Sequence, residues 1–350
     1  MTRLLPLLAL LIAGRVFAAD AVCPQKSWEH ARTDDTGWSA TTLQQATDLA
    51  RTLDTQSVLV VQGGRIVWEY GRVHSATNIH SMRKSIASML IGMQKDRGRI
   101  NLAATLADMG IDEDNEPLTP VERTATVEQI ISARSCIYHK AAYEPDDMIA
   151  NRPARGSCKP GESWYYNNWD FNIVEEVFKR QLNTSLFDAL RDDLAVPLGF
   201  EDFTRFVDTR YEYDRASKFP AYIMRISAAD LARVGLLMAR GGDWCGKQLL
   251  SREWVDKSTS LISNTGPTSA GYGYMWWSGG DKSVVHFNVP FGSKTFSARG
   301  SGGQFVVINP ALDLIIVHKV DTESGRRNVG TGDFRKLLTL IMQARKSAGG

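Results

Sequence analysis

The sequence predicts an α/β fold of the α+β type, in which an antiparallel sheet is flanked by helices and an α-helical lobe is inserted into the chain. Strand-like runs occur near both ends, in residues 57–70 and 271–320, whereas residues 100–240 are mostly helical or loop-like in pattern. The chain has 350 residues, of which 43% are hydrophobic and only 23% charged, enough to build a large core. We therefore expect one sheet assembled from the two terminal parts of the chain.

The amino-terminal elements are indicated by a capping residue and a pair of glycines. A helix is predicted from a cap near Ser39. Two β-rich runs then flank Gly63-Gly64 within "SVLVVQGGRIVWEY", which indicates a hairpin because both glycines can adopt positive φ. A second helix begins in "HSMRKSIASMLI" and is expected to run to about Lys95.

The remaining elements follow from periodicity and caps. Helices are expected at 126–133, 171–181, 185–193 and 227–240, and strands at 271–277, 283–289, 295–298 and 304–320. The last run is read as a hairpin that turns at Asn309-Pro310, and a final amphipathic helix begins near Asp333. Ser227 and Asp230 resemble a capping box, which favours a structural over a catalytic role for Asp230.

The chain contains no visible internal repeat or low-complexity linker, and this favours a single catalytic domain over residues 19–350. We expect its α/β lobe at about 40–95 and 265–350, and its helical lobe at about 96–264. The two lobes would pack closely against each other.

Residues 1–18 have the pattern of a secretory signal peptide. Arg3 precedes an apolar run from Leu4 to Ala13, and small residues suit cleavage after Ala18. The alternative, a membrane anchor, is disfavoured because the apolar run is too short to span a bilayer. We expect a periplasmic or secreted protein without stable membrane insertion after cleavage.

The net charge argues against polyanionic partners. The chain has 41 Lys and Arg against 39 Asp and Glu, and removal of residues 1–18 deletes Arg3 and Arg15, which leaves 39 of each sign. With no long basic run, binding to nucleic acid or to an anionic membrane is not expected. The expected partner is a small molecule.

The four cysteines, Cys23, Cys136, Cys158 and Cys245, suit an exported chain, in which they allow three pairings. The sequence has no C-x-x-C or H-E-x-x-H motif, and its six histidines are scattered. We expect neither a metal site nor a cofactor.

Ser81 and Lys84 form the only S-x-x-K sequence in the chain. On a helix, residues three apart lie on one face, so the hydroxyl and the amine can meet, as in hydrolases that acylate a serine and use lysine as the base. The free N–H groups of the first helical turn can also face a developing oxyanion. The alternative is an ordinary helix start with a solvated lysine.

Two further segments carry candidate site residues. Tyr166 and Asn168 form a Y-x-N element after Pro160-Gly161; a phenol near the serine can carry a proton, and an amide can hold the lysine and the substrate. The alternative is a tyrosine-rich loop that packs on the core, as expected of Tyr165.

Near the carboxyl end, "SARGSGGQFVVINP" places three glycines where a strand begins, namely Gly300, Gly302 and Gly303. They would let a substrate approach backbone N–H groups, or simply form a tight turn.

These three elements, in this order, resemble the serine β-lactamase and penicillin-binding-protein superfamily, most closely its class C-like branch, which includes carboxylesterases, D-aminopeptidases and nylon-oligomer hydrolases. The resemblance extends from the Gly63-Gly64 hairpin to "INPALDLIIV" and implies a β-lactamase/transpeptidase-like fold with a pocket between the lobes. It also implies roles: Ser81 as nucleophile, Lys84 as base, Tyr166 as proton shuttle with Asn168 in support, and the N–H groups of Ser81 and Ser301 as the oxyanion hole.

The chain departs from this family at the strand beside the pocket. Where relatives have K-T-G or H-x-G, it has Ala298-Arg299-Gly300, and strand alternation would turn Arg299 to the opposite face. Lys294-Thr295 resembles the start of K-T-G but continues with Phe296, so we interpret it as a coincidence. Relatives also often have Ser-Gly where this chain has Ser135-Cys136. Both Cys136 and Cys158 would flank the pocket, so we predict that they form a disulfide.

The preferred interpretation is an exported serine hydrolase that cleaves a small ester or amide through an acyl-enzyme. One alternative is a true β-lactamase or D-alanyl carboxypeptidase, and another is a non-catalytic periplasmic binding protein of the same fold. No G-x-S-x-G elbow supports a Ser-His-Asp hydrolase. Because Ala298 offers no cation for a substrate carboxylate, neutral esters or amides are favoured over β-lactams, unless Arg299 or Arg152 supplies the charge. Of Trp276 and Trp277, we expect at least one in the core.

Overall fold

A computed structural model describes residues 22–32, 37–265, 271–278 and 285–345. The proposed signal peptide lies outside these residues. Among the residues described, no helix is long and apolar enough to span a bilayer. In the same residues, no three metal-ligating side chains come together.

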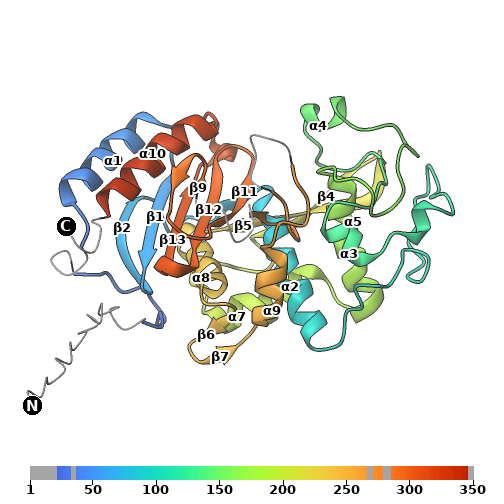
Figure 1. Cartoon of the computed structure of the whole chain (residues 1–350), viewed down its shortest axis with the longest axis horizontal. Helices are drawn as coiled ribbons and strands as arrows, with labels where there is room; N and C mark the ends of the chain where they lie inside the picture. Colours follow the sequence, from blue (N-terminus) through green and yellow to red (C-terminus); the bar gives the residue numbers. More distant parts are fainter. Residues whose placement is uncertain (1–21, 33–36, 266–270, 279–284, 346–350) are drawn as a thin grey trace, which may run out of the picture.

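The core of the molecule is an antiparallel sheet of six strands in the order β2-β1-β13-β12-β11-β8. These strands are β1 (Ser57–Gln62), β2 (Arg65–Gly71), β8 (Trp277–Ser278), β11 (Phe296–Gly300), β12 (Gln304–Asn309) and β13 (Leu314–Lys319). The amino-terminal hairpin β1–β2 therefore pairs with the carboxy-terminal hairpin β12–β13, as Figure 1 shows. The predicted assembly of one sheet from the two ends of the chain is confirmed.

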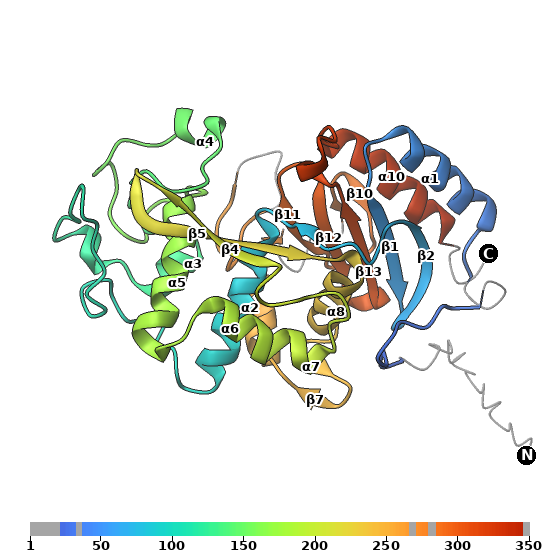
Figure 2. The same cartoon turned by 180° about the vertical axis from the view of Figure 1, so that it is seen from behind.

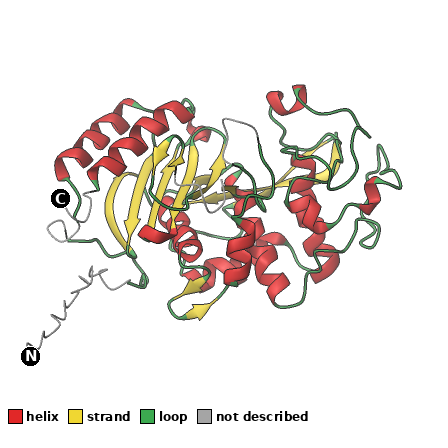
Figure 3. Ribbon diagram, viewed as in Figure 1, coloured by secondary structure: helices red, strands yellow, loops and turns green. Residues whose placement is uncertain are grey.

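Helices cover both faces of this sheet, so β12 and β13 are buried along their whole length. Helices α1 (Ala40–Thr52) and α10 (Thr331–Ala344) lie side by side on one face, and α2 (Met82–Asp96) and α8 (Ala228–Ala239) lie on the other (Figures 1 and 3). Helix α8 thus belongs with the α/β lobe, whereas we expected it in the helical lobe. Its close packing on the sheet requires Gly235, where a Cβ would lie 2.6 Å from Ile315 Cγ2.

The second lobe contains short helices and a long strand pair. Its elements are α3 (Val127–Ile131), α4 (Asp146–Ala150), α5 (Asn168–Leu182), α6 (Leu186–Ala189), α7 (Val196–Leu198), β4 (Thr209–Asp214) and β5 (Ser217–Ile226), with a π-helical turn at Leu190–Ala195. Short two-residue strands β3 (Thr77–Asn78), β6 (Asp243–Trp244), β7 (Lys247–Gln248), β9 (Val285–His286) and β10 (Val289–Pro290), and helix α9 (Arg252–Ser258), complete the fold. Figure 2 shows β4 and β5 running from the helical lobe toward the sheet.

The sheet β3-β5-β4 was not predicted, because residues 209–226 lie in a region read as helix and loop. It positions the site: Thr77 pairs with Ile226 and Asn78 with Arg225, immediately before the chain enters α2.

The predicted strand at 271–277 is wrong except for its last residue. Met275 there has φ +58°, which interrupts an extended strand. Of the predicted strand at 283–289, the described part forms a separate small hairpin, β9–β10.

Asp230 has a structural role, as expected. Its backbone N–H donates to Ser227 Oγ at 3.1 Å, and its carboxylate accepts hydrogen bonds from the N–H groups of Glu201 and Asp202. Burial raises its pKa to about 6. The carboxylate therefore fastens the loop after α7 to the start of α8.

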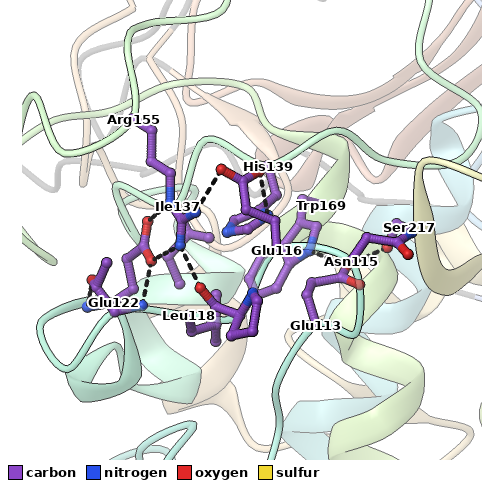
Figure 4. Close-up of polar contacts among 12 residues, drawn as sticks. Glu113, Asn115, Glu116, Leu118, Glu122, Ile137, His139, Arg155, Trp169 and Ser217 are labelled. Carbon is purple, nitrogen blue, oxygen red and sulfur yellow. Dashed lines mark hydrogen bonds and ion pairs between the residues drawn. The ribbon is translucent and has the colours of Figure 1, made fainter.

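A partly buried polar network holds the loop before α3 to helix α5 (Figure 4). Trp169 donates its indole N–H to Glu113 at 2.8 Å, and the Ser217 hydroxyl donates to the same carboxylate. Arg155 pairs with both Glu116 and Glu122. These contacts organise the outer part of the helical lobe, beside a small cavity of about 360 Å³.

Candidate active site

Ser81 and Lys84 meet at the amino-terminal end of α2. Lys84 Nζ lies 2.9 Å from Ser81 Oγ, and the lysine side chain is only 1% exposed. Ser81 is the residue that precedes the helix, with helical φ and ψ of −70° and −9°. The two functional groups are therefore in direct hydrogen-bonding contact, and the lysine is not solvated.

Tyr166 brings a third functional group to the same place from the segment that leads into α5. Its phenolic oxygen lies 2.8 Å from Lys84 Nζ. Its ring packs 4.9 Å from Phe171 and stacks on Trp277 at 5.7 Å, measured between ring centroids. Lys84 thus contacts both the serine hydroxyl and the tyrosine hydroxyl.

Burial favours the uncharged forms of Lys84 and Tyr166. It lowers the pKa of Lys84 well below its usual value, and the neighbouring cation Arg83 lowers it further. Burial also raises the pKa of Tyr166 to about 12, although a hydrogen bond with Ser81 acts in the opposite direction. A neutral lysine has a lone pair that can accept a proton from Ser81.

Arg83, to which we assigned no role from the sequence, is the neighbour of Lys84 on α2. It is fully buried, and Nη2 donates to Asn172 Oδ1 at 3.3 Å while the guanidinium lies 4.9 Å from the ring centre of Tyr222. Within the described part of the chain it has no carboxylate partner. Its positive charge is therefore not neutralised nearby, and it disfavours a second cation at Lys84.

The Y-x-N interpretation allowed Asn168 to hold the lysine, but the side chain of Asn168 makes a different hydrogen bond. Its side-chain N–H donates to the carbonyl oxygen of Tyr143 at 2.6 Å, while Lys84 hydrogen bonds to Ser81 and Tyr166. Asn168 lines the pocket, and its Oδ1 is buried without a partner among the described residues. The amide therefore supports the loop around Tyr143.

The turn between β11 and β12 closes over the serine. A Cβ on Gly300 would lie 2.6 Å from the carbonyl oxygen of Ile79 and 3.1 Å from the backbone nitrogen of Ser81, so glycine is required for this approach. Ser301 is exposed and lines the pocket. Gly302 and Gly303 complete the turn with φ +83° and +101°.

The serine opens into a pocket of about 1150 Å³ that both lobes line. Residues from the helical lobe include Tyr143, Arg152 and Glu212, and those from the α/β lobe include Trp277, Arg299 and Asn328.

Trp276 is only 1% exposed and belongs to the core, whereas Trp277 forms part of the wall. Arg152 is paired with Glu144.

Our expectation that Arg299 points away from the pocket is wrong. The strand alternation itself holds, because Ala298 pairs with Val306 and packs in the core below the sheet, while Arg299 pairs with Phe305 on the other face. However, the long side chain of Arg299 extends to within 5.0 Å of the Trp277 ring centre and lines the pocket. Lys294 does not line it, and Thr295 is buried against Asn309.

Both pairs of cysteines are linked. Cys136 and Cys158 form a disulfide with a Cα–Cα distance of 5.7 Å, and Cys23 is bonded to Cys245. The first bond closes the loop that carries Tyr143, beside the segment that leads to Tyr166. The sequence alone left the second pairing open.

The sheet with helices on both faces, the second lobe and the pocket between them define a β-lactamase-like hydrolase. Residues 44–338 match the family described as Beta-lactamase, and the chain belongs to this family. It is 24% identical over 300 residues to a 6-aminohexanoate-dimer hydrolase from Paenarthrobacter ureafaciens, an alignment that covers 75% of this chain and 71% of the relative.

Two solved structures show the same fold at low sequence identity. A putative 6-aminohexanoate-dimer hydrolase from Bacillus anthracis is 16% identical, with a TM-score of 0.66 over 92% of this chain and 88% of that one. A penicillin-binding protein homologue from Caulobacter crescentus is 15% identical, with a TM-score of 0.65 over 91% of this chain and 99% of the other. The predicted fold class and family are confirmed.

Proposed function

We propose that the protein is a serine hydrolase that cleaves a small ester or amide through an acyl-enzyme on Ser81. The observation that carries this proposal is the position of Lys84 Nζ, which lies 2.9 Å from Ser81 Oγ and 2.8 Å from Tyr166 Oη in a buried site. A binding protein would gain nothing from burying, against a serine hydroxyl, a lysine that has no carboxylate partner among the described residues.

The proposed acylation step moves one proton and exchanges one bond. Ser81 Oγ attacks the carbonyl carbon of the substrate while Lys84 Nζ takes the serine proton. The N–H groups of Ser81 and Ser301 stabilise the resulting oxyanion. When the tetrahedral intermediate collapses, the bond to the leaving group breaks, and Tyr166 donates a proton to that group and is reprotonated by Lys84. A water molecule then repeats the sequence on the acyl-enzyme and releases the acid.

The substrate class follows from the pocket and from the relatives. The relative from Paenarthrobacter ureafaciens is named for hydrolysis of a 6-aminohexanoate dimer, which favours an amide substrate. The pocket, at about 1150 Å³, has room for more than a short ester. The signal-like pattern of residues 1–18 supports a periplasmic or secreted location.

A β-lactamase is the second candidate function, and the observation that favours it is the presence of Arg299 in the pocket wall. A guanidinium there can form a charge-assisted hydrogen bond with a substrate carboxylate. Burial lowers the pKa of Arg299 to about 10, so the group remains a cation at neutral pH.

Covalent labelling tests the proposed function. The mature protein is treated with a fluorophosphonate and the modified peptide is mapped. We expect one label, on Ser81, which disappears in Ser81→Ala but persists in the control Ser324→Ala, an exposed serine outside the pocket lining. A label on another serine, or none on the folded wild-type protein, would contradict the assignment.

A further inference from the structure

The ring of His80, the residue before the proposed nucleophile, is held at both nitrogen atoms. Nδ1 lies 2.7 Å from the hydroxyl of Tyr143, and Nε2 lies 2.7 Å from the hydroxyl of Thr322. Tyr143 comes from the helical lobe, whereas Thr322 follows β13 of the main sheet. The rings of His80 and Tyr143 also stack, with centroids 6.0 Å apart. The histidine therefore joins the two lobes beside Ser81.

The backbone orients Asn78, and this allows one consistent set of hydrogen-bond directions around the ring. The N–H of His80 donates to Asn78 Oδ1 at 2.9 Å, which orients the Asn78 amide so that its Nδ2 donates to Tyr143 Oη at 3.2 Å. The Tyr143 hydroxyl is then free to donate its own proton to His80 Nδ1. This leaves the proton of the neutral ring on Nε2, which donates to Thr322. In this arrangement every member of the network is satisfied with His80 neutral.

The surroundings of His80 favour that neutral form. Burial, together with nearby cations, lowers its pKa to about 4. These cations are Arg83 of α2, Lys319 of β13 and Arg210 of β4, and Lys84 adds to their effect whenever it is protonated.

The hydrogen bonds of the ring also hold the backbone at His80 in an unfavourable conformation. Its φ is +46°, a left-handed conformation that is unfavourable for a residue with a side chain. This conformation turns the chain from β3 into the helix, so it sets where Ser81 lies relative to Lys84. Any change at His80 is transmitted directly to the next residue along the chain.

Tyr143 also reaches the other half of the site. Its carbonyl oxygen accepts a hydrogen bond from Asn168 Nδ2 at 2.6 Å, two residues after Tyr166. Its own φ is +63°, and the loop that carries it is closed by the Cys136–Cys158 disulfide. Tyr143 is therefore connected to the nucleophile segment by its hydroxyl and to the Tyr166 segment by its carbonyl.

We propose that Tyr143 and His80 act as a pair of positioning residues, which hold Ser81 in register with Lys84 and Tyr166 by joining the two lobes through the Tyr143–His80 hydrogen bond. The inference rests on the proposed function, because it assigns the pair a role in Ser81 acylation. Neither residue exchanges a proton with the substrate in this mechanism.

The first test removes one hydroxyl at a time. In Tyr143→Phe the rate of Ser81 labelling and kcat should each fall about tenfold while KM changes less than about twofold, because the lost hydrogen bond orients the nucleophile. Thr322→Val removes the partner of the other ring nitrogen and should act in the same direction. The matched control is Tyr165→Phe, which deletes a hydroxyl that donates to the Met148 carbonyl; Tyr165 itself is not among the residues that line the pocket. Wild-type labelling rates in both Tyr143→Phe and Thr322→Val would overturn the inference.

The second test is independent of catalysis. In the Ser81→Ala protein, the His80 ring is titrated by NMR with and without Tyr143→Phe. Loss of the donor to Nδ1 should raise the His80 pKa toward its usual value. In the protein that retains Ser81, His80→Asn, which tolerates positive φ, should be labelled faster than His80→Ala. An unchanged His80 pKa would show that the pair is not coupled. Absence of labelling in wild type would refute the proposed function instead and leave this titration as the test of the pair.

Discussion

Lys84 Nζ and Tyr166 Oη lie 2.8 Å apart, and burial acts on the two groups in opposite senses. It lowers the pKa of the lysine well below its usual value and raises that of the tyrosine to about 12, so burial favours the neutral form of each group. A proton that neutral Lys84 takes from Ser81 creates a cation beside the buried Arg83, and Tyr166 can pass that proton toward a leaving group. The pair is thus suited to move protons in both directions.

Removal of the amine should abolish most of the activity. Lys84→Met keeps the length of the side chain but leaves Ser81 without a base, so kcat/KM should fall by about 10²- to 10⁴-fold. Ester hydrolysis and fluorophosphonate labelling both measure this loss. The control is Lys247→Met, an exposed lysine on β7, which should behave as wild type. Labelling of Lys84→Met at the wild-type rate would show that another group activates Ser81.

Arg83 should control the pH at which the enzyme becomes active. Activity requires neutral Lys84, so it is lost as the pH falls through the pKa of this lysine in the folded protein. Arg83 lowers that pKa, and Arg83→Met should therefore move the acidic limb of the kcat/KM profile to higher pH. Arg83→Lys keeps the charge and should leave the limb near its wild-type position, as should Arg99→Met, which removes an exposed cation. A limb that shifts equally in Arg83→Met and Arg83→Lys would argue against the electrostatic role.

Gly300 should tolerate no side chain. Its Cβ would lie 2.6 Å from the Ile79 carbonyl oxygen, a backbone atom that cannot move away without shifting the segment that enters Ser81. A displacement on the order of 1 Å at a reacting group costs about a hundredfold in rate, and we expect a loss of this size in Gly300→Ala. Gly332→Ala is the control, because a Cβ there meets nothing within 4 Å and α10 gains a better helix former. Equal kcat for the two variants would contradict the proposed close approach.

Both disulfides should stabilise the fold, but only one of them should affect activity. The Cys136–Cys158 bond spans 22 residues and should stabilise the protein by about 3 kcal/mol, whereas Cys23–Cys245 spans 222 and should contribute about 5 kcal/mol. Urea unfolding of the two double Ala variants measures these values. Only loss of Cys136–Cys158 should lower kcat, because that bond closes the loop with Tyr143. A larger loss of kcat on removal of Cys23–Cys245 would contradict this assignment.

The sequence predicted the main sheet because its strands are marked by local signals. Gly63-Gly64 and Asn309-Pro310 mark the turns of two hairpins, and the buried strands beside these turns are rich in β-branched residues. By contrast, β5 was not recognised: it contains Lys218 and Pro220, and it becomes a strand only by pairing with β3 and β4. Long-range pairing of this kind has no local signature.

The proposed site was predicted in part for a similar reason. Ser81 and Lys84 are three residues apart, so helical geometry alone brings them together. The hydrogen-bond partners of the His80 ring, Tyr143 and Thr322, are more than sixty positions away, and no spacing rule predicts them. Arg299 was misjudged because alternation along a strand fixes the direction of Cβ but not the reach of a long, flexible side chain.

The last prediction concerns the substrate. Ala298 is 4% exposed and packs in the core, so the residue at the start of the Ala298-Arg299-Gly300 segment offers nothing to a substrate carboxylate. Arg299 lines the pocket, but its Nε already donates to Ser297 Oγ at 3.0 Å and its guanidinium lies over the ring of Phe287. To bind a carboxylate, it would have to give up part of this packing. We therefore expect a short-chain p-nitrophenyl ester to be turned over about ten- to a hundredfold better in kcat/KM than a chromogenic cephalosporin, the value of one lost charge-assisted hydrogen bond.

Arg299→Met distinguishes the two candidate functions on the same preparation. If Arg299 has no part in substrate binding, the variant should hydrolyse the ester and the cephalosporin in the same ratio as wild type, since Met preserves contact with Phe287 and Trp277. If the wild-type protein prefers the cephalosporin and Arg299→Met loses only that activity, Arg299 binds the carboxylate, and the protein is a β-lactamase. The comparison is made at pH 7, where the guanidinium, with its pKa of about 10, is still charged and the substrate carboxylate is ionised. Both ratios therefore report on the pocket and not on titration of either partner.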